Sequence, residues 1–403
     1  MTANNENGED DRMQRRTFGK MVAGAALAAA SMKAAHAAED LKIGAIGSLS
    51  GGGTAWGLAL QRGVTLAIDV VNQAGGLKIG EQTYKPRLVM VDDQYSATGG
   101  RTAAERLINL EKVKYIIGPI GSPPSLGAVS VTNAAKVLML SDGFSPAILK
   151  NDAHAAYNFR VMNSNLEFGP AMVKYFREHF PDVKKVALVG TNDATGQAVL
   201  PSLAKLYAAA GIQTWIEMFD RGSQEFTPLM TRMIAQNVDA LDLNSNSPGD
   251  AGLLLKQARQ TGFKGKIWQI GGPSVDEIIQ VGGPLAEGFL SLEVFDPDDP
   301  GFQKFIASYH AKWSGIMDGQ APLWNNAAKM LFEALRRAGS LDVDKVRDAV
   351  EHLDGYTPGL YGPVVWGGMA TYGVNHQQLL PFWIAEVKGG KETIVATVHP
   401  EKS

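Results

Sequence analysis

Short apolar runs alternate with longer segments of helical periodicity along most of the chain, and this alternation predicts an α/β fold. The first apolar run, residues 41–47, is partly β-branched and is typical of a buried parallel strand. A Ser/Gly loop follows at 48–53, and a helix is then predicted from Thr54 until Gly75 and Gly76 end it. Strand, glycine-rich loop and helix in this order open a doubly wound domain, in which ligands bind at the carboxyl ends of the strands.

The alternation runs twice through the sequence, which predicts two Rossmann-like lobes of similar architecture rather than one long sheet. A second run starts after a connecting strand at 159–161, and the chain from 301 to 339 is mainly helical in pattern. Because strands alternate with helices, we expect parallel sheets with right-handed crossovers. The main strands are predicted at residues 41–47, 87–91, 115–120, 137–141, 186–189, 213–219, 240–243, 267–270, 363–366 and 382–387.

Residues 1–37 have the features of an export signal rather than of a folded element. Arg15 and Arg16 open a twin-arginine motif, an Ala-rich apolar stretch at 21–32 is too short to span a bilayer, and Ala-His-Ala at 35–37 fits a cleavage site. The mature chain is therefore expected to start at Ala38. The sequence contains no cysteine, so a lipid anchor on cysteine is excluded and we expect a freely diffusing periplasmic protein.

The composition excludes several classes of function. Hydrophobic residues make up 45% and charged residues 20% of the 403 residues, which is typical of a soluble globular protein. The net charge of −3 gives no reason to expect a nucleic acid or an anionic membrane as partner. The loop at 51–56 lacks the third glycine of a dinucleotide fingerprint and the lysine of a P-loop. No histidine pair has the spacing of metal ligands either, so we expect no cofactor and no metal.

Two loops of the first run share a design that suits an anion. Ser122 and Ser145 each follow a predicted strand, precede a predicted helix and stand directly before proline. Serine is a preferred N-cap and proline is favoured at the first helical position, so both helices should direct free N–H groups into one crevice. This arrangement predicts a carboxylate site, with Trp56 offering a flat apolar face beside it. The alternative is two well-capped helices with water at their ends.

A catalytic alternative comes from residues 143–147, which approach the Gly-x-Ser-x-Gly nucleophile elbow of hydrolases. Ala147 stands in place of the last glycine, and Pro146 removes the N–H that would serve an oxyanion hole. The seven histidines are scattered, and none is placed to complete a triad. We therefore expect a binding protein that catalyses nothing, with a hydrolase as a remote alternative.

Several motifs, taken in their order along the chain, resemble one known family. They are LKIGAIGSLSG at 41–51, IDVVNQAGG at 68–76, VDDQ at 91–94, YIIGPIGS at 115–122, LKQARQTG at 255–262 and YGPVVW at 361–366. With them the mature chain resembles the type I periplasmic binding proteins of the leucine/isoleucine/valine-binding group, which deliver solutes to ABC importers. The resemblance implies hinge closure of two lobes around one solute. The expected lobes are 38–161 plus 295–366 and 162–294 plus 367–403, with crossovers near Val161, Val294 and Gly367.

The resemblance also implies which residues bind the solute. They are Trp56, Ser122, Gly143, Phe144, Ser145, Thr195, Asn246 and Gly271, of which Phe144 is our own addition as a second apolar surface and the other seven are implied by the resemblance. The first five belong to one lobe, where the serine loops hold the ligand carboxylate and the aromatic rings supply apolar contact. The last three close onto the ligand from the other lobe.

The sequence departs from the family pattern in the second lobe. Amino-acid-binding members carry an acidic residue at the position of Gly271, where it holds the ligand ammonium, and often a tyrosine at the position of Thr195. A buried ammonium without a counter-charge costs several kcal/mol. Either Asp193, Asp242 or Asp250 replaces the missing acid, or the ligand has no ammonium.

The sequence thus predicts a small carboxylate-bearing solute, which is either an amino acid or an amine-free aromatic or aliphatic acid. The expected partner is an ABC transporter permease in the inner membrane, and we expect the binding protein to be a monomer. The alternative is a ligand-sensing module that docks on a receptor.

Overall fold

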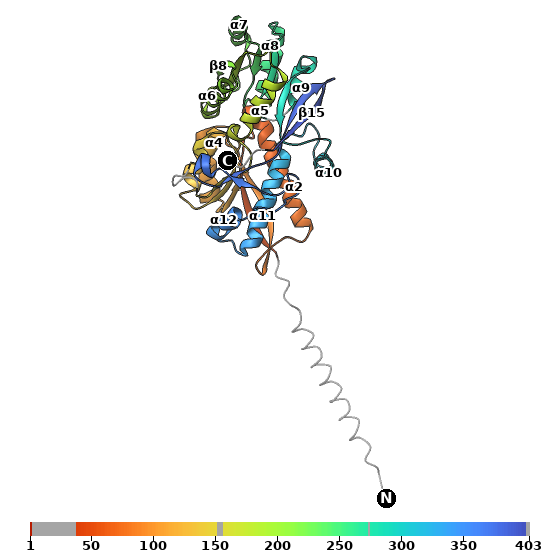
Figure 1. Ribbon diagram of the computed structural model, residues 1–403. Helices are drawn as coiled ribbons and strands as arrows, with labels where there is room; N and C mark the ends of the chain where they lie inside the picture. The colour runs from red at the N-terminus through yellow and green to blue at the C-terminus, as the bar shows by residue number, and fades with distance from the viewer. Residues whose placement is uncertain (2–37, 151–155, 273–274, 400–403) are drawn as a thin grey trace.

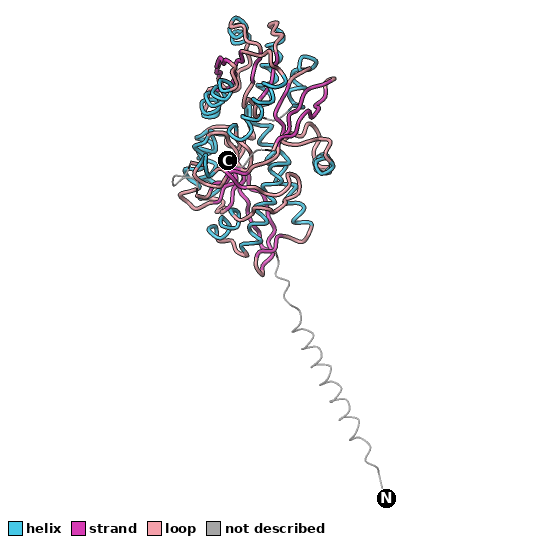
Figure 2. Tube along the Cα trace, in the orientation of Figure 1, coloured by secondary structure: helices cyan, strands magenta, loops and turns pink. Residues whose placement is uncertain are grey.

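The computed structural model describes Met1 and residues 38–150, 156–272 and 275–399, so the expected export signal lies outside the described residues. The described chain forms two lobes, each with one central sheet between helices (Figures 1 and 2). In Figure 1 the lobe with α2 (Thr54–Gln73) and α11 (Ala321–Ala338) lies below, and the lobe with α6 (Ala194–Ala209) and α8 (Pro248–Gln260) lies above. The predicted α/β fold with two lobes is confirmed.

The first sheet has eight strands in the order β12-β13-β6-β5-β4-β1-β3-β2. The strands from β3 to β6 across its centre pair in parallel, while β2 and β3 form an antiparallel hairpin around Gly80. Strands β4 and β5 are buried along their whole length, as expected where helices cover both faces. The bounds are β1 (Glu39–Ile46), β2 (Leu77–Ile79), β3 (Gln82–Val91), β4 (Tyr115–Ile117), β5 (Leu138–Ser141), β6 (Asn158–Arg160), β12 (Trp366–Gly367) and β13 (Gln377–Gln378).

Two helix groups cover the first sheet. Helices α2 and α11 pack against each other and form one apolar core with α12, while α3 and α4 form a second core with β1, β4 and β5. A Cβ atom at Gly63 would lie 2.2 Å from the carbonyl oxygen of Ala321, so only glycine allows α2 to approach α11 this closely. The remaining elements are η1 (Gly51–Gly53), α3 (Ala97–Asn109), α4 (Ser122–Thr132), η2 (Pro146–Ile148), α12 (Val343–Glu351) and α13 (Met369–Tyr372).

The second sheet has seven strands in the order β15-β14-β11-β10-β9-β7-β8. Its strands from β7 to β11 pair in parallel, and β14 and β15 add an antiparallel hairpin at one edge. Helices α5 and α6 belong to one apolar core and α7, α8 and α9 to another. The bounds are β7 (Lys185–Thr191), β8 (Gln213–Phe219), β9 (Ala240–Asp242), β10 (Lys266–Gln269), β11 (Leu290–Glu293), β14 (Phe382–Lys388), β15 (Lys391–Val398), α5 (Asn165–His179), α7 (Thr227–Ala235), α9 (Val275–Gly282) and η3 (Gly283–Ala286).

The chain passes between the two sheets three times. It leaves the first sheet after β6, returns after β11 through α10 (Pro300–His310) and α11, and leaves again after β13. Gln377 of β13 pairs with Arg160 of β6, so the first sheet extends beyond Gly367, where the sequence places the last crossover. The isolated pair of residues in β13 has no strand-like periodicity, which is why the pattern gives no sign of it.

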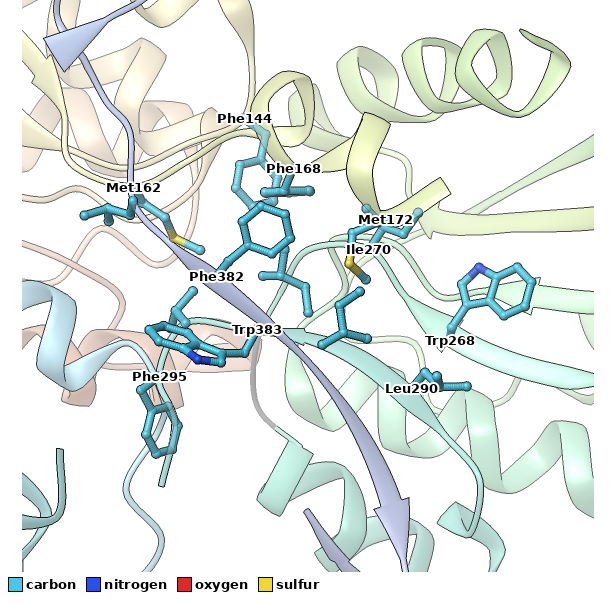
Figure 3. Close-up of a cluster of buried hydrophobic side chains, with 14 of the residues drawn as sticks. Phe144, Met162, Phe168, Met172, Trp268, Ile270, Leu290, Phe295, Phe382 and Trp383 are labelled. Carbon is cyan, nitrogen blue, oxygen red and sulfur yellow. The ribbon is translucent and has the colours of Figure 1, made fainter. Parts of the chain in front are cut away.

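One apolar core joins the lobes close to these crossings (Figure 3). Phe144 follows β5 of the first lobe, and its ring meets the ring of Phe168 from α5 edge to face at a centroid distance of 5.4 Å. Phe168 in turn contacts Phe382, which begins β14. Figure 3 shows these three rings in a row, with Met162 and Trp383 beside them. The loop that follows β5 is therefore packed directly against the second lobe.

One predicted helix of the first lobe is wrong. The segment after Ser145 forms only a three-residue 3-10 helix, Pro146–Ile148, instead of an α-helix. A turn this short has no aligned series of peptide units, so it contributes little of the positive potential that a long helix has at its N-terminus. The second helix N-terminus expected at the crevice is therefore absent from the described residues.

Candidate functional site

A cavity lies between the lobes, at the carboxyl ends of strands from both sheets. The empty space between its lining side chains, including the part open to solvent, is about 300 Å³. The first lobe contributes the start of α2, the loops after β3, β4 and β5 and the residue before α11, while the second contributes α6 and the loops after β9 and β10. The described lining residues are Trp56, Tyr95, Ile120, Gly121, Asp142, Gly143, Phe144, Thr195, Ser245, Gly272 and Gln320.

Aromatic rings form much of the apolar lining. The rings of Trp56 and Tyr95 lie 5.6 Å apart at an interplanar angle of 40°, and Phe144 is held by its contact with Phe168. All of these side chains are buried and fixed by neighbours from other elements. The cavity therefore offers a rigid apolar surface to a small solute.

Three polar atoms of the described lining have no hydrogen-bond partner. They are the indole Nε1 of Trp56, Oδ1 of Asp142 and Oε1 of Gln320. Each belongs to a side chain that is at most 4% exposed. Buried polar atoms are nearly always paired, so this group marks the positions where a bound solute would complete the hydrogen bonds.

Asp142 is the one carboxylate among the described lining residues. Burial raises the pKa of Asp142 from 3.8 to about 7, although the nearby cation of Arg160 acts in the opposite direction. Arg160 is fully buried and is bonded to other groups, since Nε donates to Gln377 Oε1 and Nη1 donates to the carbonyl oxygen of Gly143 at 2.8 Å. None of the described cations forms an ion pair with Asp142.

A second contact bridges the two lobes beside the cavity. The guanidinium of Arg221, from the loop after β8, lies 4.2 Å from the centre of the Tyr95 ring, which belongs to the first lobe. Asp193 fixes this guanidinium, because Nε and Nη2 both donate to its Oδ2, at 3.0 and 2.7 Å. Nη2 also donates to Thr191 Oγ1 at 2.8 Å. This cation–π contact holds the lobes together at the rim of the site.

Comparison with known proteins identifies the family of this fold and cavity. The family described as "Periplasmic binding protein" matches residues 40–392, nearly the whole described chain. The chain belongs to this family of periplasmic binding proteins. A leucine-, isoleucine-, valine-, threonine- and alanine-binding protein of Pseudomonas aeruginosa is 26% identical over 328 residues, which are 80% of this chain and 85% of the relative.

Solved structures share the fold of this periplasmic binding protein. A leucine-binding protein of Thermotoga maritima has a TM-score of 0.78 at 24% identity, over 89% of this chain and 99% of that one. A solute-binding protein of an R. palustris ABC transporter, solved in complex with benzoate, has a TM-score of 0.77 at 21% identity, over 90% of this chain and 97% of that one. Among the described residues of the present chain, no helix has the length and apolar character needed to cross a membrane.

The serine loops of this periplasmic binding protein lie behind the cavity lining. Ser122 is fully buried, and its Oγ accepts hydrogen bonds from the backbone N–H groups of Phe144 and Ser145, at 3.1 and 3.0 Å. Helix α4 begins at Ser122 with Pro123 and Pro124, which have no N–H to offer. The N–H of Ser145, one of the donors expected to hold a carboxylate, is therefore bonded within the protein, the prolines offer none, and the two serines do not line the cavity.

Of the three residues expected from the second lobe, one lines the cavity and two lie outside its lining. Thr195 lines the cavity, whereas Asn246 lies deeper, where its Nδ2 donates to the carbonyl oxygens of Val189 and Leu243. Gly271 borders the cavity residue Gly272, and a Cβ on Gly271 would lie 2.9 Å from the Phe168 ring. The space that an acidic side chain would need at this position is filled by aromatic rings.

The three acids considered as replacements for an acid at Gly271 do not line the cavity. Asp193 is the N-cap of α6 and the partner of Arg221. Asp242 accepts from the Tyr207 hydroxyl at 3.0 Å and from the Ile270 N–H at 3.1 Å. Asp250 lies near Arg221, with an N–O distance of 4.0 Å. Each of these acids therefore has a role within the second lobe.

Sequence reasoning missed several lining residues. Asp142 comes directly after β5, and Tyr95 lies in the loop four residues after the end of β3, so the rule that ligands bind at carboxyl ends could have named both. Ser245 and Gly272 are sequence neighbours of two expected residues. Gln320 precedes α11, far along the chain, and only the packing of α11 against α2 brings it to the cavity. The sequence around Gln320 contains no signal for this position.

Proposed function

We propose that this periplasmic binding protein is the solute-binding component of an ABC importer of the branched-chain amino acid type. The cavity between the lobes carries this proposal, because a solute bound there would contact both lobes at once. A solute that touches both lobes stabilises the closed arrangement over the open one, and the permease can then distinguish loaded from empty protein. The protein would catalyse nothing and would act in the periplasm after export by its twin-arginine signal.

The lining of the cavity supports a small, partly apolar solute. A lining with three aromatic rings and a few polar groups from both lobes suits a small solute with an apolar part, such as leucine or benzoate. Relatives are named for aliphatic amino acids, and one structural neighbour was solved with benzoate. The lining and the relatives together therefore support either an amino acid or a small carboxylic acid as the solute. The permease of the inner membrane is the proposed partner, and a monomer is the proposed state.

A binding screen tests this function. The full chain, freed of any co-purified solute by unfolding and refolding, would be melted with leucine, isoleucine, valine, 4-methylpentanoate, benzoate and benzamide. A ligand present at about 100 times its dissociation constant adds about 2.7 kcal/mol to the free energy of unfolding, which is readily visible as a rise in melting temperature. If none of these probes raises the melting temperature, the proposal of a small-solute importer in this class is contradicted.

A matched pair of tryptophan variants locates the binding. Trp56→Leu removes a ring that lines the cavity, and affinity for the binding probe should fall about tenfold or more. Trp215→Leu removes a tryptophan of β8 that is 38% exposed, and it should leave the affinity unchanged. Equal affinity in the two variants would place the solute elsewhere. Co-purification with the cognate permease, rather than with a receptor, separates transport from sensing.

A further inference from the structure

We infer that Asp142 binds a nitrogen donor of the solute, so that the ligand carries an ammonium or a primary amide and is not an amine-free carboxylic acid. This inference rests on the proposed function and narrows its substrate class. It places the acceptor for the solute nitrogen on the first lobe, at the end of β5, instead of at the position of Gly271 on the second lobe.

The backbone around Asp142 is fixed in place. Its N–H donates to the carbonyl oxygen of Pro119 at 2.9 Å, and its carbonyl oxygen accepts from the Ser125 hydroxyl at 2.6 Å. The side chain is 3% exposed, lines the cavity, and leaves Oδ1 without a partner. A buried carboxylate oxygen without a partner is costly, and an N–H donor from a solute would remove that cost.

The surroundings of Asp142 disfavour an anion. A ligand carboxylate would lie beside the buried side chain of Asp142, and like charges at such distances repel strongly whenever Asp142 is ionised. The amides of Phe144 and Ser145, which could have compensated, donate to Ser122 instead. A solute with a nitrogen donor meets neither difficulty.

The other lining groups fit a solute that has an oxygen acceptor next to its nitrogen. The indole N–H of Trp56 can only donate, so it suits a carbonyl or carboxylate oxygen. Thr195 and Gln320 can each present a donor or an acceptor, so they suit either arrangement. One fixed acceptor and one fixed donor around a small cavity match an α-amino acid or a carboxamide.

The charged groups that face this region leave the acid of Asp142 available. Arg160 lies on the first lobe and is bonded to Gln377 and to the carbonyl oxygen of Gly143. Across the cavity Arg221 is paired with Asp193 and covers the ring of Tyr95. Burial raises the pKa of Tyr95 to about 12, so this phenol stays neutral in the range where Asp142 titrates. Burial also raises the pKa of Asp93, whose carboxylate accepts from the Tyr95 N–H, to about 6 and the pKa of Asp242 to about 7, but neither acid lines the cavity. Asp142 is therefore the acid of the described lining whose charge changes close to neutral pH.

Matched solutes test the inference by calorimetric titration of the refolded full chain. Benzamide and benzoate have nearly the same shape, and leucine and 4-methylpentanoate differ only in the amine. We expect the nitrogen-bearing member of at least one pair to bind about tenfold or more tightly than its amine-free partner. Tighter binding of benzoate and 4-methylpentanoate than of their partners would overturn the inference while leaving the proposed function intact. Absence of binding by all four, together with no effect of isoleucine or valine in the melting screen, would contradict both.

Variants identify the acceptor. Asp142→Asn keeps the shape of the side chain, and it should reduce the affinity for the preferred nitrogen-bearing probe about tenfold or more. The control is Asp242→Asn. Asp242 is also a fully buried acid at a strand end, but it belongs to the second lobe and does not line the cavity, so this variant should leave the affinity unchanged. Equal affinities of the two variants and the unaltered chain would overturn the inference.

The pH dependence of binding gives a readout that needs no variant. Since the pKa of Asp142 is about 7 without solute, an ammonium must displace a proton from it as the pH falls. The affinity for leucine should therefore weaken about tenfold from about pH 8 to about pH 6, with release of roughly half a proton on binding near pH 7. The opposite arrangement, in which protonated Asp142 donates to a ligand carboxylate, predicts stronger binding at the lower pH. That trend would overturn the inference.

Discussion

A side chain added at Gly271 should destabilise the second lobe and should not restore the acid of amino-acid-binding relatives. Two physical effects act at this position. The backbone has φ of +87°, where a residue with a Cβ is strained by about 1–2 kcal/mol. The new Cβ would also lie 2.9 Å from Cζ of Phe168 and 3.1 Å from Cε2 of Phe144, closer than carbon atoms pack.

The rings cannot easily move away from the new Cβ. Phe168 is 1% exposed and is held between Phe144 and Phe382, so relief requires repacking of the core that joins the lobes (Figure 3). Overpacking of this kind costs about 1–3 kcal/mol. The sum of backbone strain and overpacking for Gly271→Ala is then about 2–5 kcal/mol.

A glycine in the same lobe separates the two effects. Gly262 follows α8 with φ of +95°, and a Cβ added there would meet no atom within 4 Å, so Gly262→Ala carries the backbone strain alone. Urea unfolding followed by tryptophan fluorescence should show Gly271→Ala to be less stable than Gly262→Ala by about 1–3 kcal/mol. Gly271→Glu should be less stable still and should bind leucine no better than the unaltered chain. Equal losses in the two alanine variants would refute the claim that the rings fill this space.

Two further predictions concern the lobe contact and a buried acid. Replacing Tyr95 by leucine removes the ring beneath Arg221, so solute binding should weaken several-fold to about thirtyfold and the radius of gyration in solution scattering should increase. Tyr95→Phe keeps the ring and should behave like the unaltered chain. Identical scattering and affinity for the two variants would contradict this role of the ring. Burial raises the pKa of Asp242 from 3.8 to about 7, so its contribution to folding stability is lost as the pH rises from about 4 to about 7. Asp242→Asn should therefore lose less unfolding free energy over this range than the unaltered chain, and equal slopes of stability against pH would argue against the raised pKa.

Much of the candidate site could be predicted because strand ends are visible in the sequence. Trp56, Gly143, Phe144 and Thr195 were expected at the cleft, and all four line the cavity. The same rule applied to every strand end would have added Tyr95 and Asp142. It could not have shown that the Oγ of Ser122 accepts hydrogen bonds from two backbone N–H groups of the next loop, because these bonds depend on how β4 and β5 lie side by side.

The sequence by itself determined the alternation of strands and helices, and hence two lobes with ligand-binding loops at their carboxyl ends. These features are local, since apolar periodicity, caps and glycines act within a few residues of the chain. Only the tertiary structure decided that Gln320 meets Trp56 at one cavity and that Phe144 and Phe168 occupy the space beside Gly271. It also left Asp142 as the carboxylate that faces the cavity. Such contacts join residues far apart in the chain, and they depend on the shapes of both lobes together, which no local pattern records.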